Sequence, residues 1–379
     1  MNAGADGLRP IRVLHLRDSP WVDGPGRTII ESGRHFDRCR IDYHIGIFVG
    51  SAEQEHPMAA VATMHALSVH KIVDRGGVDL NAVMQIVALV DRLRIQVLHT
   101  SDFRSRMYGL LVHLRRPHLT LVTTVHGWIA NTRRRRLVRF LDKVLLRHSR
   151  IVVMVSDATR SLVPRWWLPQ GRVAVLRNAI VIEEYGVTAG TSTSRNEGPR
   201  SSTRILNVGR LSEEKGQDLL IRAVADLAGQ YEGLELLIAG RGPCEGALRE
   251  LAGRLGLNDR VHFLGYVEDM PALYAEVDLV VQSSLTEGLP NVILEAAHLG
   301  LPIIATDVGG TREVIEHGTT GWLIAPGSVP PIADALRSFM ERRDEFVGMA
   351  SRARDRIEQE FSFAVRTTRM MRIYEGLME

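Results

Sequence analysis

Short runs of β-branched and aliphatic residues alternate with segments of helix length along almost the whole chain. Runs of this kind, bounded by turn residues, predict parallel sheets built from βαβ units. The runs lie at 11–16, 41–48, 95–100, 119–126, 151–156 and 172–178 in the first half, and at 204–210, 234–240, 260–265, 278–284 and 302–307 in the second. We therefore expect an α/β protein with two Rossmann-like domains, and ligands at the carboxyl ends of the strands and in the cleft between the domains.

A segment rich in Gly, Ser and Thr separates the two sets of strands. It reads GVTAGTSTSRNEGPRSST and holds few large apolar residues, which is typical of a linker. The expected division is a first domain at 1–185, the linker at 186–203, a second domain at 204–360 and a C-terminal helix at 361–379 that packs back on the first domain. The length of 379 residues also favours two domains over one.

Charge and cysteine usage narrow the class of protein. Residues 1–200 hold 29 Lys and Arg against 17 Asp and Glu, whereas residues 201–379 hold 18 against 27. The two cysteines lie far apart without metal-ligand neighbours, so we expect neither a disulfide nor a zinc site, as in a reducing cytoplasm. The N-terminal apolar run is too short for a signal peptide, and no run reaches about 18 apolar residues. These features predict a cytoplasmic protein.

The common nucleotide and metal motifs are missing. The cluster GRGPCEG has Glu245 where a dinucleotide-binding turn needs its third glycine, and Pro243 removes a backbone donor. The sequence has no P-loop, no Asp-x-Asp pair and no His, Cys and acid cluster at metal-ligand spacing, so we expect no metal cofactor. The basic residues lack interleaved aromatics, which argues against nucleic acid as a partner.

The segment TEGLPNVILE lies between a strand at 278–284 and a helix that begins near Pro290. Glu287 precedes that helix, and Glu295 lies ~7.5 Å along it at about 1.5 Å per residue. Helical side chains lean toward the N-terminus, so both acids can face one opening beside unpaired backbone donors. We expect those donors to belong to Gly288, Leu289 and Asn291. Such a set suits a polyhydroxylated ligand, although acids at these places can also be simple dipole partners or solvated residues.

Two more turns follow strands and offer positive charge or backbone amides. In VGRLSEEKG, Arg210 and Lys215 come after a strand end and would offset the charge of a diphosphate. The alternative is a solvated turn that pairs its own charges. Near the N-terminus, a turn at Gly24 and Gly26 precedes a helix expected to start near residue 27 or 28, which would make an anion site. A plain βα turn is the alternative.

A basic amphipathic helix is expected in NTRRRRLVRFLDKVLLRHSR. Leucines and a valine form an apolar stripe beside basic residues spaced by three and four, namely Arg136, Arg139, Lys143, Arg147 and Arg150. Such a helix can lie on an anionic membrane surface. It can also pack on the core with a solvated basic face, and the basic first half of the chain favours the membrane reading slightly.

Taken together, these segments resemble the retaining glycosyltransferases of family 4, which have the two-domain GT-B fold. The resemblance covers almost the whole chain and rests on five motifs in the family's order: DGPG, TTVHGW, VGRLSEEKG, IAGRGP and the long segment that starts at TEGLPNVILE. It is strongest from 204 to 324.

The resemblance implies roles for individual residues. Glu287 and Glu295 form the family's E-x7-E motif, with Glu287 near the hydroxyls of the donor sugar and Glu295 on the ribose. Arg210 and Lys215 hold the diphosphate, and His126 faces the donor sugar. The remaining implied donor contacts are backbone groups, at Gly24 and Gly26 for phosphate or acceptor and at Tyr266 and Val267 for the base. A structural histidine at 126 and a plain turn at 266–267 remain the alternatives.

Two turns depart from the family pattern. Gly-Pro-Gly replaces Gly-Gly in the first, and Arg177-Asn178-Ala179 replaces Pro-Asn-Gly later on. Neither change removes a charged motif residue.

The expected function is retaining, metal-independent transfer of a hexose-type sugar from a UDP- or GDP-sugar. The acceptor would be a saccharide, a lipid-linked or a small phosphorylated molecule of cell-surface polysaccharide or glycolipid synthesis. The protein would act in the cytoplasm, with possible contact at the inner face of an anionic membrane. A nucleotide-sugar epimerase of related fold and a sugar-nucleotide-binding protein without catalysis are the alternatives.

Overall fold

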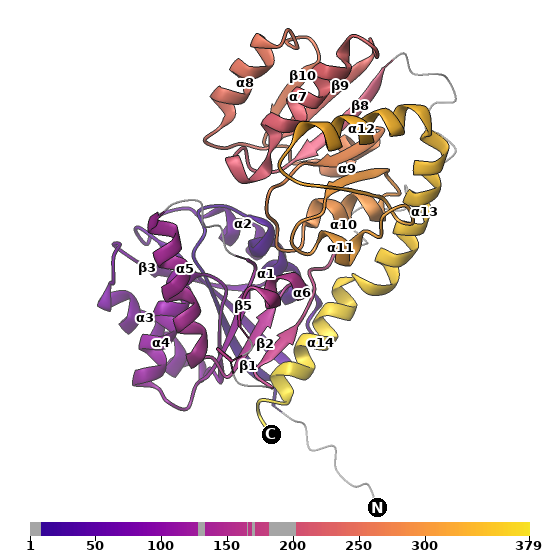
Figure 1. The fold of residues 1–379 in the computed structure, drawn as a ribbon. Helices are drawn as coiled ribbons and strands as arrows, with labels where there is room; N and C mark the ends of the chain where they lie inside the picture. The colour runs from indigo at the N-terminus through magenta and orange to yellow at the C-terminus, as the bar shows by residue number, and fades with distance from the viewer. Residues whose placement is uncertain (1–8, 128–132, 165, 169–170, 182–201) are drawn as a thin grey trace, which may run out of the picture. The chain divides into compact units, whose positions relative to one another are not determined.

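The chain forms two compact units in a computed structural model (Figure 1). The structure describes residues 9–127, 133–164, 166–168, 171–181 and 202–379. Unit 1 comprises Met1–Asn178 with Phe363–Glu379, and unit 2 comprises Ala179–Ser362. Most of the linker expected at 186–203 lies outside the described residues. Among the described helices, none is long and apolar enough to cross a bilayer.

The described part of unit 1 holds a seven-stranded sheet in the order β3-β2-β1-β4-β5-β6-β7, and every neighbouring pair is parallel. Its strands are β1 (Ile11–Arg17), β2 (Ile41–Val49), β3 (Ser68–Val73), β4 (Val97–Thr100), β5 (Thr120–Val125), β6 (Ile151–Met154) and β7 (Val173–Val175). Alternate residues of one strand serve opposite faces, because strand side chains have a period of two. Val13 packs in the core on one face and Leu14 in the core on the other.

Helices cover both faces of this sheet. The face that carries Val13 packs against α1 (Gly24–His35), α2 (Pro57–Met64) and α14 (Phe363–Glu375), which comes from the far end of the sequence and contacts α1 (Figure 1). The opposite face packs against α3 (Leu80–Leu93) and α4 (Phe103–Arg115). The unit also contains α5 (Arg133–Leu145), the 3-10 turn η1 (Leu146–His148) and α6 (Asp157–Ser161).

Among the described residues, unit 2 holds a six-stranded parallel sheet in the order β10-β9-β8-β11-β12-β13. Its strands are β8 (Thr203–Val208), β9 (Leu234–Ala239), β10 (Val261–Gly265), β11 (Leu279–Gln282), β12 (Ile303–Thr306) and β13 (Trp322–Ile324). One face packs on α7 (Gln217–Ala228), α8 (Glu245–Arg254) and α12 (Val329–Glu341). Helix α10 (Asn291–His298) contacts β11, β12 and α13 (Arg343–Glu360). Shorter helices are η3 (Glu213–Lys215), α9 (Met270–Ala275) and α11 (Thr311–Val314).

The expected α/β class with two parallel sheets is confirmed. Each of the eleven predicted apolar runs contains a strand, but β3 and β13 were not predicted. In β3 only Ile72 is buried, since the strand lies at the sheet edge, and β13 has three residues. Neither gives the continuous apolar run of a strand buried on both faces.

The strand order reverses direction once in each sheet. In unit 1 the reversal lies between β1 and β4, and in unit 2 between β8 and β11. The connections that follow the two strands of such a pair run to opposite faces of the sheet. The loops after their carboxyl ends therefore diverge and leave room for a ligand. The residues after β1, β4, β8 and β11 are therefore the first place to look for a site.

A buried polar layer ties α14 to the sheet of unit 1. His99 of β4 shares a 2.6 Å hydrogen bond with the Tyr374 hydroxyl and a 2.8 Å one with Thr124, and its ring stacks on His15 with centroids 3.9 Å apart. Arg366 of α14 donates to the carbonyls of Leu176 and Arg177 at 3.0 and 2.8 Å. Burial lowers the pKa of His99 to about 3, and burial followed by the charge of His99 lowers the pKa of His15 well below its usual value.

These histidines predict a loss of stability in weak acid. The unfolded chain binds a proton at each of them below about pH 6.5, whereas the folded chain keeps them neutral, so the free energy of unfolding should fall as pH drops below about 6.5. Each neutral histidine contributes a slope of up to about 1.4 kcal/mol per pH unit in that window. Urea unfolding between pH 7 and pH 5 should show a shallower fall for His99→Gln than for the wild type. The exposed His118→Gln is the control, and equal slopes for His99→Gln and the wild type would contradict the prediction.

Candidate functional site

Glu287 is the centre of a polar cluster at the strand reversal of unit 2. Its Oε1 accepts from Lys215 Nζ at 2.5 Å, from Gln282 Nε2 at 2.8 Å and from Ser284 Oγ at 2.7 Å. Lys215 ends η3 in the loop after β8, and the other three residues lie at or after the end of β11. The cluster therefore joins the loops of the two strands that flank the reversal.

The two predicted cations occupy different surroundings. The Lys215 side chain is mostly buried, and its one bonded partner among the described residues is the Glu287 carboxylate. An ammonium group has three N–H donors, so two of them remain beside Glu287. The Arg210 side chain is exposed and bonds to no described residue, while its carbonyl accepts from Gln217 and holds the loop. Both cations stand at the same sheet edge, and their charge is available to an anionic ligand.

A turn at Gly309 and Gly310 packs directly against the backbone of Glu287 and Gly288. The N–H of Gly310 donates to the carbonyl of Gly288 at 2.7 Å. Gly309 has φ of +55°, and a Cβ at this position would lie 2.0 Å from the Glu287 carbonyl oxygen. Only glycine allows this approach, because any side chain would overlap the Glu287 backbone.

The second acid of the predicted pair is buried inside α10. Glu295 lies in the second turn, and its Oε2 accepts from the Tyr274 hydroxyl at 2.8 Å. The helix begins at Asn291 with Pro290 as its N-cap, close to the predicted start. Leu289 is buried just before that start.

The predicted base-contacting residues follow directly after β10. Tyr266 is 64% exposed, and Val267 is half-buried. Gly265, the last residue of β10, accepts from the N–H of Gly240 at 2.7 Å. Tyr266 and Val267 thus lie at the carboxyl edge of the same sheet as Glu287, two strands beyond β8.

The glycine turn of unit 1 differs from the expectation. Helix α1 begins at Gly24 instead of near residue 27 or 28, so both glycines lie in its first turn. Asp23 caps the helix and accepts from the N–H of Gly26 at 2.8 Å, and Arg17 at the end of β1 bonds the other oxygen of Asp23 at 2.5 Å. The N–H of Gly26 is therefore already paired, because a capping side chain takes the donor that an anion would use.

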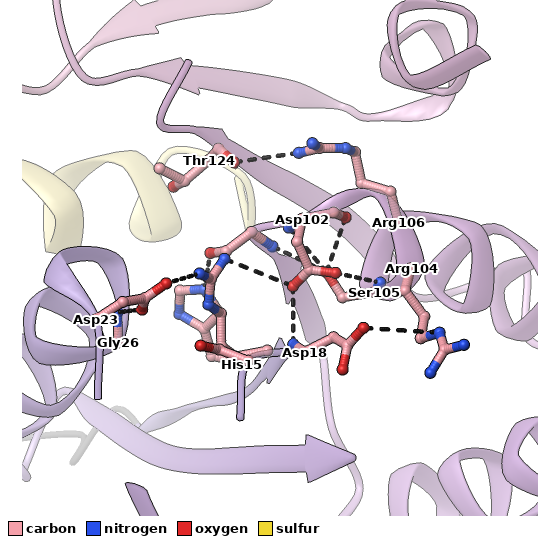
Figure 2. A network of polar contacts seen from close by, with 12 residues as sticks. His15, Asp18, Asp23, Gly26, Asp102, Arg104, Ser105, Arg106 and Thr124 are labelled. Atoms are coloured by element: carbon pink, nitrogen blue, oxygen red, sulfur yellow. Dashed lines mark hydrogen bonds and ion pairs between the residues drawn. The ribbon is translucent and has the colours of Figure 1, made fainter. Parts of the chain in front are cut away.

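Further acids gather at the same edge of unit 1 (Figure 2). Asp102 caps α4, accepts from the N–H of Asp18 at 2.9 Å and lies 3.7 Å from Arg17. Arg104 lies 3.6 Å from Asp18 and 3.1 Å from Asp74. Burial, followed by the charge of Asp102, raises the pKa of Asp18. The strand reversal of unit 1 is thus lined by alternating carboxylates and guanidinium groups.

His126 follows β5 and lines a small cavity in unit 1 together with His99, Thr124 and Arg366. Both of its ring nitrogens are buried and have no hydrogen-bond partner among the described residues. Burial, followed by the charges of Arg17 and Arg366, lowers the pKa of His126 well below its usual value. The ring is therefore neutral near pH 7 and offers one donor and one acceptor.

The basic helix is shorter than expected. Helix α5 ends at Leu145, so Arg147 lies in η1 and Arg150 lies just before β6. The side chain of Arg136 lies outside the described residues. The face turned inward carries Asp142, which takes a two-pronged bond from Arg106 at 2.6 and 2.7 Å.

The predicted apolar stripe of this helix is largely exposed. Of its members, Leu137 is 59% and Leu141 43% exposed, while Val144 and Leu145 are half-buried. Phe140, outside the predicted stripe, is 56% exposed beside Leu137. Arg139 is exposed as well, whereas Lys143 donates to the carbonyl of Leu162 at 2.5 Å, and burial followed by the charge of Arg139 lowers its pKa. Apolar and basic side chains therefore share one exposed surface, which we call the α5 surface.

Sequence reasoning missed Gln282 and Ser284 beside Glu287, and in unit 1 it missed Arg17, Asp23 and the charged residues around Asp102. Gln282 ends a strand that otherwise reads Leu-Val-Val, and a polar residue at the carboxyl end of a buried strand is a signal that could have been used. Asp23 precedes a glycine turn, as a capping residue does.

Two family models match consecutive parts of the chain. One, described as Glycosyltransferase Family 4, matches residues 22–184, and the other, described as Glycosyl transferases group 1, matches residues 202–342. The chain belongs to glycosyltransferase family 4. The family's GT-B fold agrees with the two parallel-sheet units described above.

Relatives in this family share about a third of aligned residues with the chain. An alpha-D-kanosaminyltransferase of Streptomyces kanamyceticus is 31% identical over 249 residues, 64% of each chain. A GDP-mannose-dependent alpha-(1-6)-phosphatidylinositol monomannoside mannosyltransferase of Mycobacterium tuberculosis is 31% identical over 216 residues, 54% of this chain and 56% of that one. The chain thus aligns with somewhat under two thirds of the length of these relatives.

Solved structures support the fold. The HepE protein of Anabaena, solved with UDP and glucose, superimposes with a TM-score of 0.84 at 22% identity and covers 97% of this chain and 100% of its own. A sucrose-phosphate synthase of Thermosynechococcus elongatus gives 0.78 at 18% identity and covers 97% and 99%.

The close contact between Gly309 and the Glu287 backbone predicts a large loss of stability when one methyl group is added at Gly309. Gly309→Ala should push the Glu287 turn away and lower the free energy of unfolding by more than the roughly 1–2 kcal/mol that the left-handed conformation alone costs. Gly300→Ala is a matched control, since its φ is +64° and nothing lies within 4 Å of the added carbon. Urea unfolding measures the free energy of unfolding of both variants. An equal loss of that free energy in the two would contradict the predicted overlap with the Glu287 backbone.

Proposed function

We propose that the chain transfers a hexose-type sugar from a UDP- or GDP-sugar to an acceptor, with retention of the anomeric configuration. The observation that carries this proposal is the convergence of Lys215 and Glu287 at the strand reversal of unit 2, with Arg210 on the same edge. A carboxylate accepts from sugar hydroxyls, and cations bind a diphosphate, so the cluster suits both halves of one nucleotide sugar.

The chemistry asks mainly for control of charge. The sugar passes through an oxocarbenium-like state while the nucleoside diphosphate leaves. Arg210 and the two remaining N–H groups of Lys215 would stabilise the charge of the leaving group. In this proposal these cations do the work that a metal does elsewhere. Glu287 positions the sugar and stabilises developing positive charge, and the acceptor attacks on the face from which the phosphate departs.

Glu295, Tyr266 and Val267 complete the proposed donor site. Glu295 would hold the ribose, while the backbone at Tyr266 and Val267 would bind the base. The N–H groups of Gly288, Leu289 and Asn291 lie near the start of α10, whose positive end favours anionic groups.

The α5 surface supports a membrane-associated acceptor. Leu137 and Phe140 are exposed beside Arg139, and Trp166, which is 78% exposed, packs edge-to-face on Trp167 with the ring centroids 5.3 Å apart. Trp167 in turn lies 6.5 Å from Phe140 and under the guanidinium of Arg147. Aromatic and aliphatic side chains next to arginines suit the interface of an anionic bilayer. We propose a lipid-linked acceptor, for cell-surface polysaccharide or glycolipid synthesis on the cytoplasmic side, ahead of a free saccharide or phosphorylated acceptor.

The donor reaction predicts the behaviour of two variants. Purified protein with UDP-, GDP- and ADP-sugars and a membrane extract should release nucleotide only when the extract is present. Glu287→Gln and Lys215→Met should each lower kcat by about 100-fold or more, as expected for groups that stabilise charge in the transition state. EDTA should leave the rate unchanged.

Matched substitutions control for unfolding. Lys71→Met removes another of the three lysines, from the exposed surface of β3, and should keep full activity. An isomerised sugar without released nucleotide would support the epimerase alternative, and donor binding without turnover would support a binding protein.

The α5 surface predicts binding to anionic vesicles. The double variant Leu137→Ser, Phe140→Ser should lose roughly ten-fold or more of its partition onto phosphatidylglycerol vesicles, because each serine removes an apolar side chain from the interface. Sedimentation with vesicles measures this loss. Leu114→Ser, which is on α4 and 67% exposed in the wild type, is the control. Equal binding of phosphatidylcholine and phosphatidylglycerol vesicles by the wild type would contradict the role of charge.

A further inference from the structure

One oxygen of Glu287 takes every hydrogen bond that the described residues give to this carboxylate. Oε1 accepts from Lys215, Gln282 and Ser284 within 2.8 Å, and these donors come from two different loops. A carboxylate has about four lone-pair sites on its two oxygens, so three donors fill Oε1. Oε2 bonds to no described residue. Because it is not one of the side-chain atoms that are both buried and without a partner, Oε2 is accessible to solvent.

Gln282 holds its amide in a single orientation. The ionised carboxylate can only accept, so the amide must turn Nε2 toward Glu287. Its Oε1 then points away from Glu287, where it is buried and finds no hydrogen-bond partner in the part of the chain that the structure describes, and the whole residue is 5% exposed. An unsatisfied buried acceptor costs stability, so this glutamine is poorly explained by packing alone.

The three donors also restrict rotation of the carboxylate. The last torsion of a glutamate is broad and roughly two-fold, so a loosely held carboxylate exchanges its two oxygens freely. Donors on one oxygen from the loop after β8 and from the end of β11 oppose that exchange, because a rotated carboxylate would leave three donors unpaired.

We propose that Gln282 is a positioning residue, which with Ser284 and Lys215 fixes Oε1 so that Glu287 presents only Oε2 to the donor sugar. This inference rests on the proposed function. A single fixed acceptor takes one hydrogen from one hydroxyl, so the enzyme selects donors that carry a hydroxyl at one ring position and discriminates against the sugar that lacks it.

The test uses Gln282→Leu, which keeps a similar side-chain volume and removes both the donor and the unsatisfied oxygen. With the nucleotide sugar that the wild type uses, kcat should fall about 10-fold, while the melting temperature stays equal or rises, since a buried unsatisfied oxygen is gone. A structural role would lower stability and activity together. Ser284→Ala should give a similar loss of kcat.

Monodeoxy analogues of the donor sugar give a second measurement. For the wild type, kcat/KM for one analogue should be at least about 100-fold lower than for the parent sugar. In Gln282→Leu this ratio of the two kcat/KM values should be about ten-fold smaller. Asn207→Leu is the matched control, since Asn207 is a buried amide in the adjacent strand β8. Its Nδ2 donates to the carbonyl of Val281 at 2.8 Å, and its Oδ1 has no partner among the described residues. This variant should keep the wild-type ratio.

The outcomes separate this inference from the proposed function. Wild-type kcat and an unchanged analogue ratio in Gln282→Leu, together with an inactive Glu287→Gln, would overturn the positioning role alone. A fall in melting temperature that accounts for the lost activity would overturn it as well. Full activity in Glu287→Gln would overturn the assignment of Glu287 and the inference with it.

Discussion

Parallel pairing of strands is the constraint on which the rest of the structure depends. It brings every carboxyl end to one edge of a sheet, and the reversal of strand order between β8 and β11 keeps the two following loops apart. Lys215 and Glu287 are 72 positions apart in the chain and meet within a hydrogen bond because their loops leave neighbouring strands at that edge. In unit 1 the same geometry brings Arg17 and Asp102 together, one at the end of β1 and the other after β4.

Much of the fold could be predicted because strands buried on both faces are nearly continuous apolar runs. That signal fails at β3, which lies at an edge and buries only Ile72, and at the three-residue β13. The site was predictable in position, because Lys215 and Glu287 each follow a strand. The contact between Lys215 and Glu287 was not, since periodicity shows that strands exist but does not show which strands become neighbours. Gln282 looked like the last residue of a strand, and the turn after β11 brings Glu287, five positions further on, back to its amide.

Two ion pairs explain the other differences between the expected and the observed structure. A turn with two glycines suggests free amide groups, yet Arg17 stabilises Asp23 in the position where it caps Gly26. The spacing of leucines in α5 predicts an apolar stripe without showing what it faces, and the helix turns Asp142 inward because Arg106 of α4 pairs with it. A buried acid is costly unless it is paired, and a helical pattern contains no information about a partner 36 positions away.

The return of α14 to unit 1 has a consequence for biogenesis. Tyr374 and Arg366 complete a polar layer whose other members, such as His99, are made hundreds of residues earlier. Domains generally fold as units during synthesis, the N-terminal one first. Here the first unit to leave the ribosome stays without one of its covering helices until the last stretch of chain emerges. Unit 2 comprises residues that are all synthesised before α14. It can therefore complete its packing earlier than unit 1, although most of unit 1 is synthesised first.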